Sequence, residues 1–213
     1  MRALKRPSPN HGPRKGGAAV DMVVLHYTAM ESAEASLARL CDPAAEVSAH
    51  YLIDLDGTLW QLVAEDRRAW HAGLSHWQGE SDVNSRSIGI ELQNRGDHPF
   101  PVPQMRALEA LLADIRARHA IPPERVLGHS DIAPERKGDP GARFDWRGLA
   151  RAGHALWVEG TGGSDGVADL MRAAGYDPAA GAEALLSAFR LRFGPLAGLH
   201  AAQALVDRIA PTS

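Results

Sequence analysis

The sequence has little cysteine, no long apolar run and no excess of basic charge, and each shortage excludes a class of protein. Its 213 residues contain one cysteine, Cys41, which excludes an internal disulfide framework and a cysteine-rich zinc site. No stretch approaches the roughly 20 apolar residues that a membrane span requires. The formal net charge of −3 gives no reason to expect a nucleic acid or an anionic membrane as a partner.

The first residues, M-R-A-L-K-R-P-S-P-N-H-G-P-R-K-G-G, are basic but contain no apolar segment of the signal-peptide type. We therefore expect a cytoplasmic protein, with a periplasmic location as the alternative. Three prolines and no aromatic residue favour an extended arm that wraps the domain over a nucleic-acid-binding tail. The sequence leaves the oligomeric state open.

The remaining composition is that of a globular protein, with 45% hydrophobic and 23% charged residues. Apolar runs predict strands, and amphipathic spacing predicts helices. The expected strands are 20–27, the arms of a hairpin within 48–63 with a type I′ turn at Asp56-Gly57, 87–93, and a short one from Val126; the expected helices are 32–41, 103–118 and 145–156. This alternation predicts an α/β fold in which a mixed central β-sheet is flanked by helices.

The composition changes near residue 159, where E-G-T-G-G-S-D-G is typical of a linker. Beyond it, helical patterns cover 167–174, 182–192 and 200–209. We therefore predict a domain over residues 1–157, a linker over 158–165, and a small three-helix domain over 166–213.

Four side chains capable of metal or acid–base chemistry follow the ends of predicted strands. His26, Glu91 and His129 lie at three strand ends, and Asp139 lies on the polar stretch 128–141, which we expect to be a surface loop. Ligands gather at strand ends in such sheets. Two histidines and a carboxylate would leave a zinc ion one open position, as a catalytic zinc site requires.

Each of these residues also has an ordinary structural interpretation. A single histidine on an apolar strand is more often a hydrogen-bonded structural residue. Glu91 is harder to explain that way, because its neighbours in S-I-G-I-E-L-Q would bury an unpaired carboxylate at high cost. A raised pKa there would suit a general base. Lys137, two residues before Asp139, could reach the same site and stabilise an oxyanion, or be an exposed loop charge.

Five ordered motifs resemble the zinc-dependent N-acetylmuramoyl-L-alanine amidases of type 2: V-V-L-H-Y-T, V-S-A-H-Y-L-I-D-L-D-G, R-A-W-H-A-G, N-S-R-S-I-G-I-E-L-Q-N and V-L-G-H-S-D-I-A-P-E-R-K-G-D-P-G. This family is related to phage T7 lysozyme and the peptidoglycan recognition proteins, and the motifs are most similar to its AmpD/AmiD branch. The resemblance covers roughly residues 6–157. Residues 164–213 are similar to the small peptidoglycan-binding domain of AmiD-like enzymes; a helical extension that only packs is the alternative.

The resemblance implies that Zn²⁺ is held by His26, His129 and Asp139, with Glu91 as the acid/base and Lys137 assisting at the oxyanion. His50, Trp70, His71 and Asn84 match positions that line the substrate groove. The implied reaction cleaves the amide between (1,6-anhydro-)N-acetylmuramic acid and L-alanine of a muropeptide or of peptidoglycan, in cell-wall recycling. The alternatives are an exported amidase acting on intact peptidoglycan and a recognition protein that binds a muropeptide without cutting it.

Overall fold

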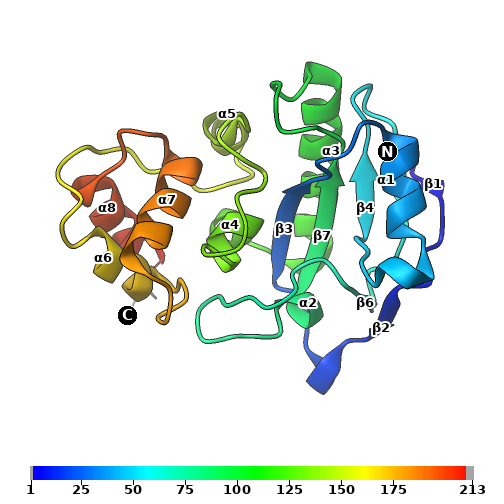
Figure 1. Ribbon diagram of the computed structural model, residues 1–213, viewed down its shortest axis with the longest axis horizontal. Coiled ribbons are helices and arrows are strands. Elements are labelled where there is room, and N and C mark those ends of the chain that lie inside the picture. Colours follow the sequence, from blue (N-terminus) through cyan, green and yellow to red (C-terminus); the bar gives the residue numbers. More distant parts are fainter. Residues whose placement is uncertain (1, 210–213) are drawn as a thin grey trace.

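The computed structural model describes residues 2–209 and places eight strands and eight α-helices within them (Figure 1). The strands are β1 (Leu4–Lys5), β2 (His11–Pro13), β3 (Met22–Tyr27), β4 (Tyr51–Ile53), β5 (Leu59–Gln61), β6 (Arg67–Ala69), β7 (Ser87–Leu92) and β8 (Val126–Gly128). The helices are α1 (Ala33–Leu40), α2 (Val83–Arg86), α3 (Val102–His119), α4 (His129–Ile132), α5 (Trp146–Arg151), α6 (Val167–Ala174), α7 (Ala182–Phe193) and α8 (Leu199–Ile209).

Six strands form one mixed sheet in the order β1-β5-β4-β7-β3-β8. Strands β4, β7, β3 and β8 run parallel to their neighbours in that order, whereas β4 and β5 form the antiparallel hairpin. The predicted mixed α/β architecture is confirmed. Because the parallel strands β3, β7 and β8 share one direction, the residues at their carboxyl ends meet at one edge of the sheet.

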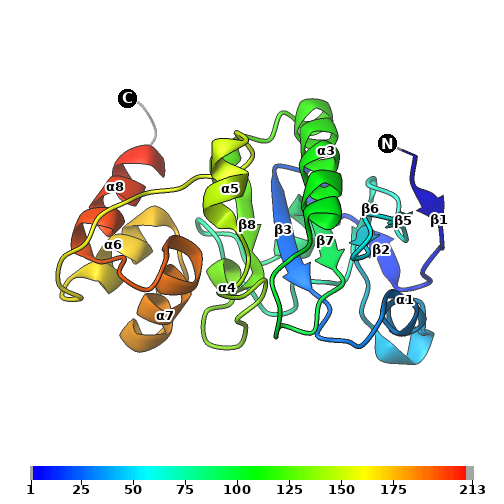
Figure 2. The same ribbon diagram turned by 90° about the horizontal axis from the view of Figure 1, so that it is seen from above.

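Strand β7 shows how the sequence divides the sheet into two faces. Ile88, Ile90 and Leu92 are fully buried against α3, while the alternate residues Gly89 and Glu91 point to the other face. Helices α3 and α5 cover the first face, and α1 lies against the second (Figure 2). The second face therefore carries the polar residues of the strand.

The amino-terminal arm is folded onto the domain, as the sequence suggests. Strand β1 pairs with β5, and β2 pairs with β6 in a separate two-stranded sheet. Arg14 then inserts its guanidinium beneath the sheet edge, where it donates hydrogen bonds to the backbone carbonyls of Glu65 and Ser85 at 2.8 Å each. Among the described residues, none of the helices combines the length and the apolar character needed to cross a membrane.

Three local expectations are wrong. The hairpin turn is not type I′, because Gly57 has a positive φ of 88° but Asp56 does not, and the Gly57 N–H donates to the Asp54 carbonyl instead. Helix α5 ends at Arg151, since Gly153 adopts a positive φ of 80° just beyond it. The stretch 128–141 is not purely a surface loop: Gly128 ends β8, and the next four residues form α4 and are all buried.

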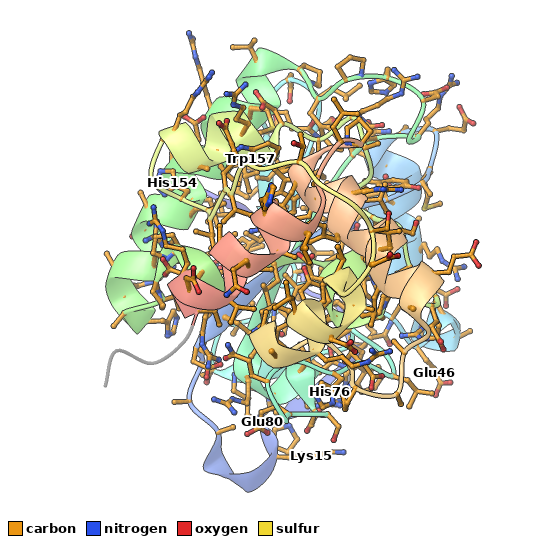
Figure 3. The ribbon with its side chains drawn as sticks, turned by 90° about the vertical axis from the view of Figure 1, so that its left-hand side faces the viewer. Lys15, Glu46, His76, Glu80, His154 and Trp157 are labelled. Atoms are coloured by element: carbon orange, nitrogen blue, oxygen red, sulfur yellow. The ribbon has the colours of Figure 1, made fainter. Side chains whose placement is uncertain are left out.

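The three C-terminal helices form where the periodicity places them. Their apolar side chains join one hydrophobic cluster with Met22, Leu127 and Ile132 of the sheet region, through residues such as Met171 and Phe189. Figure 3 views the molecule from the side of these helices, and Trp157, labelled there, has its ring 5.9 Å from that of Phe193. The division of the chain into two domains stays a prediction.

Candidate active site

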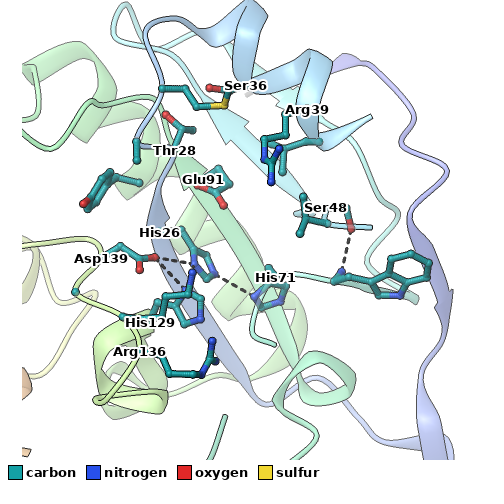
Figure 4. A pocket seen from close by; sticks show the side chains of 18 residues that line it. His26, Thr28, Ser36, Arg39, Ser48, His71, Glu91, His129, Arg136 and Asp139 are labelled. Carbon is teal, nitrogen blue, oxygen red and sulfur yellow. Dashed lines mark hydrogen bonds and ion pairs between the residues drawn. The ribbon is translucent and has the colours of Figure 1, made fainter. Parts of the chain in front are cut away.

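The fold brings together the side chains predicted at the strand ends. His26 and Glu91 are register partners on the neighbouring strands β3 and β7, so their side chains lie on the same face of the sheet. His129 begins α4 directly after β8, and Asp139 returns on the following loop. Figure 4 shows these four residues around one hollow.

His26, His129 and Asp139 form a tight cluster of possible metal ligands. The Nδ1 atoms of the two histidines lie 3.0 Å apart, and the Asp139 Oδ2 lies 3.0 Å from that of His26 and 3.1 Å from that of His129. Both histidines are almost fully buried. Three donor atoms of the types that zinc accepts therefore converge on one point.

A chain of hydrogen bonds assigns the tautomer of His26. The Ser87 hydroxyl donates to the Val83 carbonyl at 2.7 Å, so its oxygen accepts from His71 Nε2 at 3.1 Å. His71 Nδ1 is then an acceptor and receives the Nε2–H of His26 at 3.1 Å. This leaves the Nδ1 of His26 unprotonated, with its lone pair towards the cluster.

A single contact assigns the tautomer of His129. Its Nε2 lies 3.1 Å from the Ala72 carbonyl oxygen, which can only accept, so Nε2 carries the proton and Nδ1 is free. Burial lowers the pKa of His26 to about 4, with the neighbouring His129 as the next cause. Burial acts to raise the pKa of Asp139, but the two imidazoles beside it hold that pKa below its usual range.

These assignments test whether the cluster fits a metal. Two imidazole lone pairs and an ionised carboxylate face one another at about 3 Å, and three acceptors at that distance repel one another unless a cation lies between them. The donor set of two nitrogens and one oxygen suits Zn²⁺. His26, His129 and Asp139 therefore fit a single bound metal ion.

Glu91 is a second carboxylate in the lining of the same cavity. Its Oε2 is buried and has no hydrogen-bond partner among the described residues. Burial, and after it the charge of Asp139, raise the pKa of Glu91 to about 8, against the opposing effect of the Lys137 ammonium. A carboxyl group with such a pKa can exchange a proton near neutral pH.

The cluster and Glu91 open into one cavity of about 420 Å³. One wall is α1, which presents Ser36 and Arg39, and the opposite wall is the loop with Arg136 and Lys137 (Figure 4). Lys137 is exposed and lies at this wall, in a loop that turns after Ala133. The predicted pair of Glu91 and Lys137 thus faces the same space as the metal cluster.

The four residues expected to line a substrate groove divide into two pairs. Trp70 and His71 line the cavity. His50 and Asn84 are buried behind its lining: His50 Nδ1 accepts from the Gly89 N–H at 3.0 Å, and Asn84 Oδ1 accepts from the N–H groups of His71 and Ala72. In this structure His50 and Asn84 support the wall from behind.

Two supporting residues escaped the sequence analysis. Ser87 is the last side chain in the hydrogen-bond chain of His26. Gly89 makes room for His71, because a Cβ at that position would lie 2.5 Å from the imidazole ring. The alternation in S-I-G-I-E-L carried the signal, since it places Ser87, Gly89 and Glu91 on one face.

The fold and the cluster define a mixed α/β protein with a His–His–Asp site suited to one metal ion. Comparison with known families makes this specific: the family model described as N-acetylmuramoyl-L-alanine amidase (Amidase_2) matches residues 16–142. Since that stretch is more than half of the chain, the protein belongs to the N-acetylmuramoyl-L-alanine amidase family.

Two individual relatives are named as amidases of this kind. The N-acetylmuramoyl-L-alanine amidase AmiD of Escherichia coli is 44% identical over 66% of this chain and 55% of its own length. The chain thus spans only about half of that relative. The 1,6-anhydro-N-acetylmuramyl-L-alanine amidase AmpD of Enterobacter cloacae is 37% identical over 66% of this chain and 84% of its own length.

Solved structures extend the likeness to the C-terminal helices. AmiD from E. coli, solved in complex with anhydro-N-acetylmuramic acid-L-Ala-D-gamma-Glu-L-Lys, matches 98% of this chain and 93% of that chain, with a TM-score of 0.80 and 33% identity. AmpDH3 from Pseudomonas aeruginosa, in complex with anhydromuramic pentapeptide, matches 90% and 91%, with a TM-score of 0.76 and 32% identity.

Proposed function

We propose that this protein is a zinc-dependent amidase that hydrolyses the amide between N-acetylmuramic acid and the L-alanine of a peptidoglycan stem peptide. The observation that carries the proposal is the His26–His129–Asp139 cluster sharing one cavity with the unpaired carboxyl group of Glu91. The family match supports the identity of the bond that is cut, and two relatives of at least 32% identity were solved with anhydro-muramyl peptides.

In this proposal His26, His129 and Asp139 hold the metal. A zinc ion supplies Lewis acidity there, which polarises a carbonyl group and makes water easier to deprotonate. The chain contributes the fixed tautomers: the His71–Ser87 chain and the Ala72 carbonyl keep both Nδ1 atoms free of protons.

Glu91 moves the protons of the reaction. It takes a proton from the attacking water as the new C–O bond forms, and gives that proton to the alanine nitrogen as the C–N bond breaks. The raised pKa of Glu91 lets it carry the proton between these steps.

Lys137 stabilises the negative charge that develops on the carbonyl oxygen during attack. Its ammonium lies at the wall of the cavity that Glu91 and Asp139 share, and it is close enough to act on the pKa of Glu91. A cation placed where charge develops lowers the barrier of acyl transfer. Trp70, which also lines the cavity, is the proposed apolar contact for the substrate.

Cleavage of soluble 1,6-anhydro muropeptides in cell-wall recycling is the finer part of the proposal. The relatives named 1,6-anhydro-N-acetylmuramyl-L-alanine amidase support it. The cytoplasmic location and the binding of peptidoglycan by residues 166–213 stay predictions.

The test is mass spectrometry of the products after zinc-loaded protein is incubated separately with a purified anhydro-muropeptide and with intact sacculi. Release of free stem peptide from the soluble substrate alone supports a recycling amidase. Release from both supports an amidase that also acts on intact wall. No release from either, with zinc bound, overturns the proposal in favour of a muropeptide-recognition protein.

A further inference from the structure

The C-terminal part of the chain contacts the turn that carries His129 at one buried carboxylate, Asp131. Asp131 lies two residues after His129, in the single turn of α4, and is 1% exposed. Two side chains from beyond residue 166 hold it. We propose that Tyr176 and Arg192 are positioning residues for His129, so that the C-terminal helices help to build the metal site.

The contacts of Asp131 occupy both of its oxygens. Oδ1 accepts a hydrogen bond from the Tyr176 hydroxyl at 2.8 Å. Oδ2 accepts from the Arg192 Nη1 at 2.9 Å and from the Gly128 N–H at 2.7 Å. We call Asp131, Tyr176 and Arg192 the Asp131 clamp. It connects the C-terminal helices to the backbone at the exit of β8.

The Arg192 side chain is 3% exposed, and several groups hold it in place. Its Nη2 donates to the carbonyls of Val126 at 3.0 Å and Leu156 at 3.3 Å. Its guanidinium carbon lies 3.6 Å from the ring centroid of Trp146, a cation–π distance. A guanidinium held in this way presents its Nη1 to Asp131 in one geometry.

A displacement of α4 would move two metal ligands together. His129 is the first residue of that turn, and the Ser130 N–H donates to the Asp139 carbonyl at 3.0 Å. The loop between the two ligands is also held by the C-terminal part, because the Gly181 N–H donates to Glu135 Oε1 at 2.9 Å. The geometry of His129 and Asp139 therefore depends on where these helices sit.

If the Asp131 clamp had a purely structural role, its loss would change only the stability of the fold. A buried ion pair is weak support for stability by itself, since its two charges lose their hydration. The clamp instead fixes the direction of a ligand, as outer partners of metal ligands generally do. Its loss should therefore weaken zinc binding by folded protein, beyond any loss of stability.

The test rests on the proposed zinc site and measures zinc affinity of the full chain by competition with a chelator, at a temperature where every variant is folded. Arg192→Met should weaken zinc binding about tenfold, the lower end for outer partners of metal ligands, and Tyr176→Phe about threefold. Arg192→Lys keeps a cation opposite Asp131 but loses the planar fork and the stacking on Trp146, so it should weaken zinc binding about threefold, less than Arg192→Met.

The matched control is Leu205→Ala in α8. Leu205 is 2% exposed in the same hydrophobic cluster and has an apolar side chain that cannot hydrogen-bond to Asp131, so this change should lower stability and leave zinc affinity unchanged. If Arg192→Met does not fold, Tyr176→Phe and Arg192→Lys carry the comparison. Zinc affinities of the clamp variants equal to that of Leu205→Ala would overturn the inference. A wild type that binds no zinc would overturn the metal site itself.

Discussion

The two histidines of the cluster draw their support from different parts of the chain. His26 is oriented from within the sheet region, through His71 and then Ser87 on the adjacent strand β7. His129 donates to Ala72, but the turn that carries it is held by Asp131 and, through that carboxylate, by Arg192 of α7. One proposed zinc ligand is thus positioned by strand register, and we infer that the other depends on the docking of helices about 60 residues away in sequence.

One site thus combines a side chain positioned by strand pairing with a side chain positioned by helix packing. Strand register places His26 opposite Glu91. The turn of α4 is too short to hold itself, because a single helical turn has almost no hydrogen bonds of its own. The helices beyond residue 166 supply what that turn lacks.

The largest expected effect comes from removing either ligand. His26→Ala and His129→Ala should each weaken zinc binding by more than about 100-fold, above the range for outer partners, and abolish amide hydrolysis. The comparison predicts similar losses, because the two ligands differ in support and not in role. The measurement is zinc affinity with turnover of an anhydro-muropeptide. An active, zinc-free His26→Ala protein would contradict the proposed chemistry.

Glu91→Gln should separate metal binding from chemistry. The amide keeps the size of the carboxyl group but cannot accept a proton, so turnover should fall about 10²- to 10⁴-fold while zinc affinity stays near that of the wild type. Both are measured on the same preparation. Turnover that survives this change would show that another group moves the proton.

The same variant should reveal the buried charge of Glu91 in the metal-free protein. Its folded pKa, about 8, lies above the ordinary value of 4.5, so its stabilising contribution is complete below 4.5 and is lost as the pH rises through 8. Glu91→Gln should therefore become more stable than the wild type as the pH rises, by up to about 5 kcal/mol. Parallel melting temperatures from pH 5 to 9 would contradict a shifted pKa.

Much of this site follows from the position of residues on strands. His26 and Glu91 lie near the ends of two apolar runs, and His129 directly follows a third, so their meeting at one sheet edge is predictable. The hydrogen-bond chain is not, because His71 lies between β6 and α2 and only the folded chain brings it against Ser87. The same holds for His50 and Asn84, whose backbone contacts a linear sequence does not display.

Arg192 had a sequence signal that is easy to pass over. Leu185, Phe189 and Arg192 recur at helical spacing, which places a charge on the apolar stripe of α7, whereas Arg190 falls on the exposed side. A charge on such a stripe predicts a buried partner. Which carboxylate it meets could not be predicted, since Asp131 is 61 residues away.

Gly89→Ala tests the His26 side of the comparison. A Cβ at residue 89 would lie 2.5 Å from the His71 ring, so His71 must shift away from His26. Zinc affinity should fall about tenfold, as expected when the outer partner of a metal ligand is displaced. Gly12→Ala is the matched control, because a Cβ there meets nothing within 4 Å. Equal zinc affinities in the two variants would remove His71 from this role.

The smallest expected effect is the energetic coupling between two residues, Ser87 on the His26 side and Tyr176 on the His129 side. Ser87→Ala removes the acceptor of His71, and Tyr176→Phe removes one donor to Asp131; each should weaken zinc binding about threefold. The two residues share no hydrogen-bond partner, so the double variant should show the product of the single effects, about tenfold, to within about twofold. Zinc titrations of the four proteins measure this directly. A larger departure would mean that the sheet and the C-terminal helices hold the cluster as one coupled unit, since only a shared displacement of His26 and His129 could link changes on opposite sides of the site.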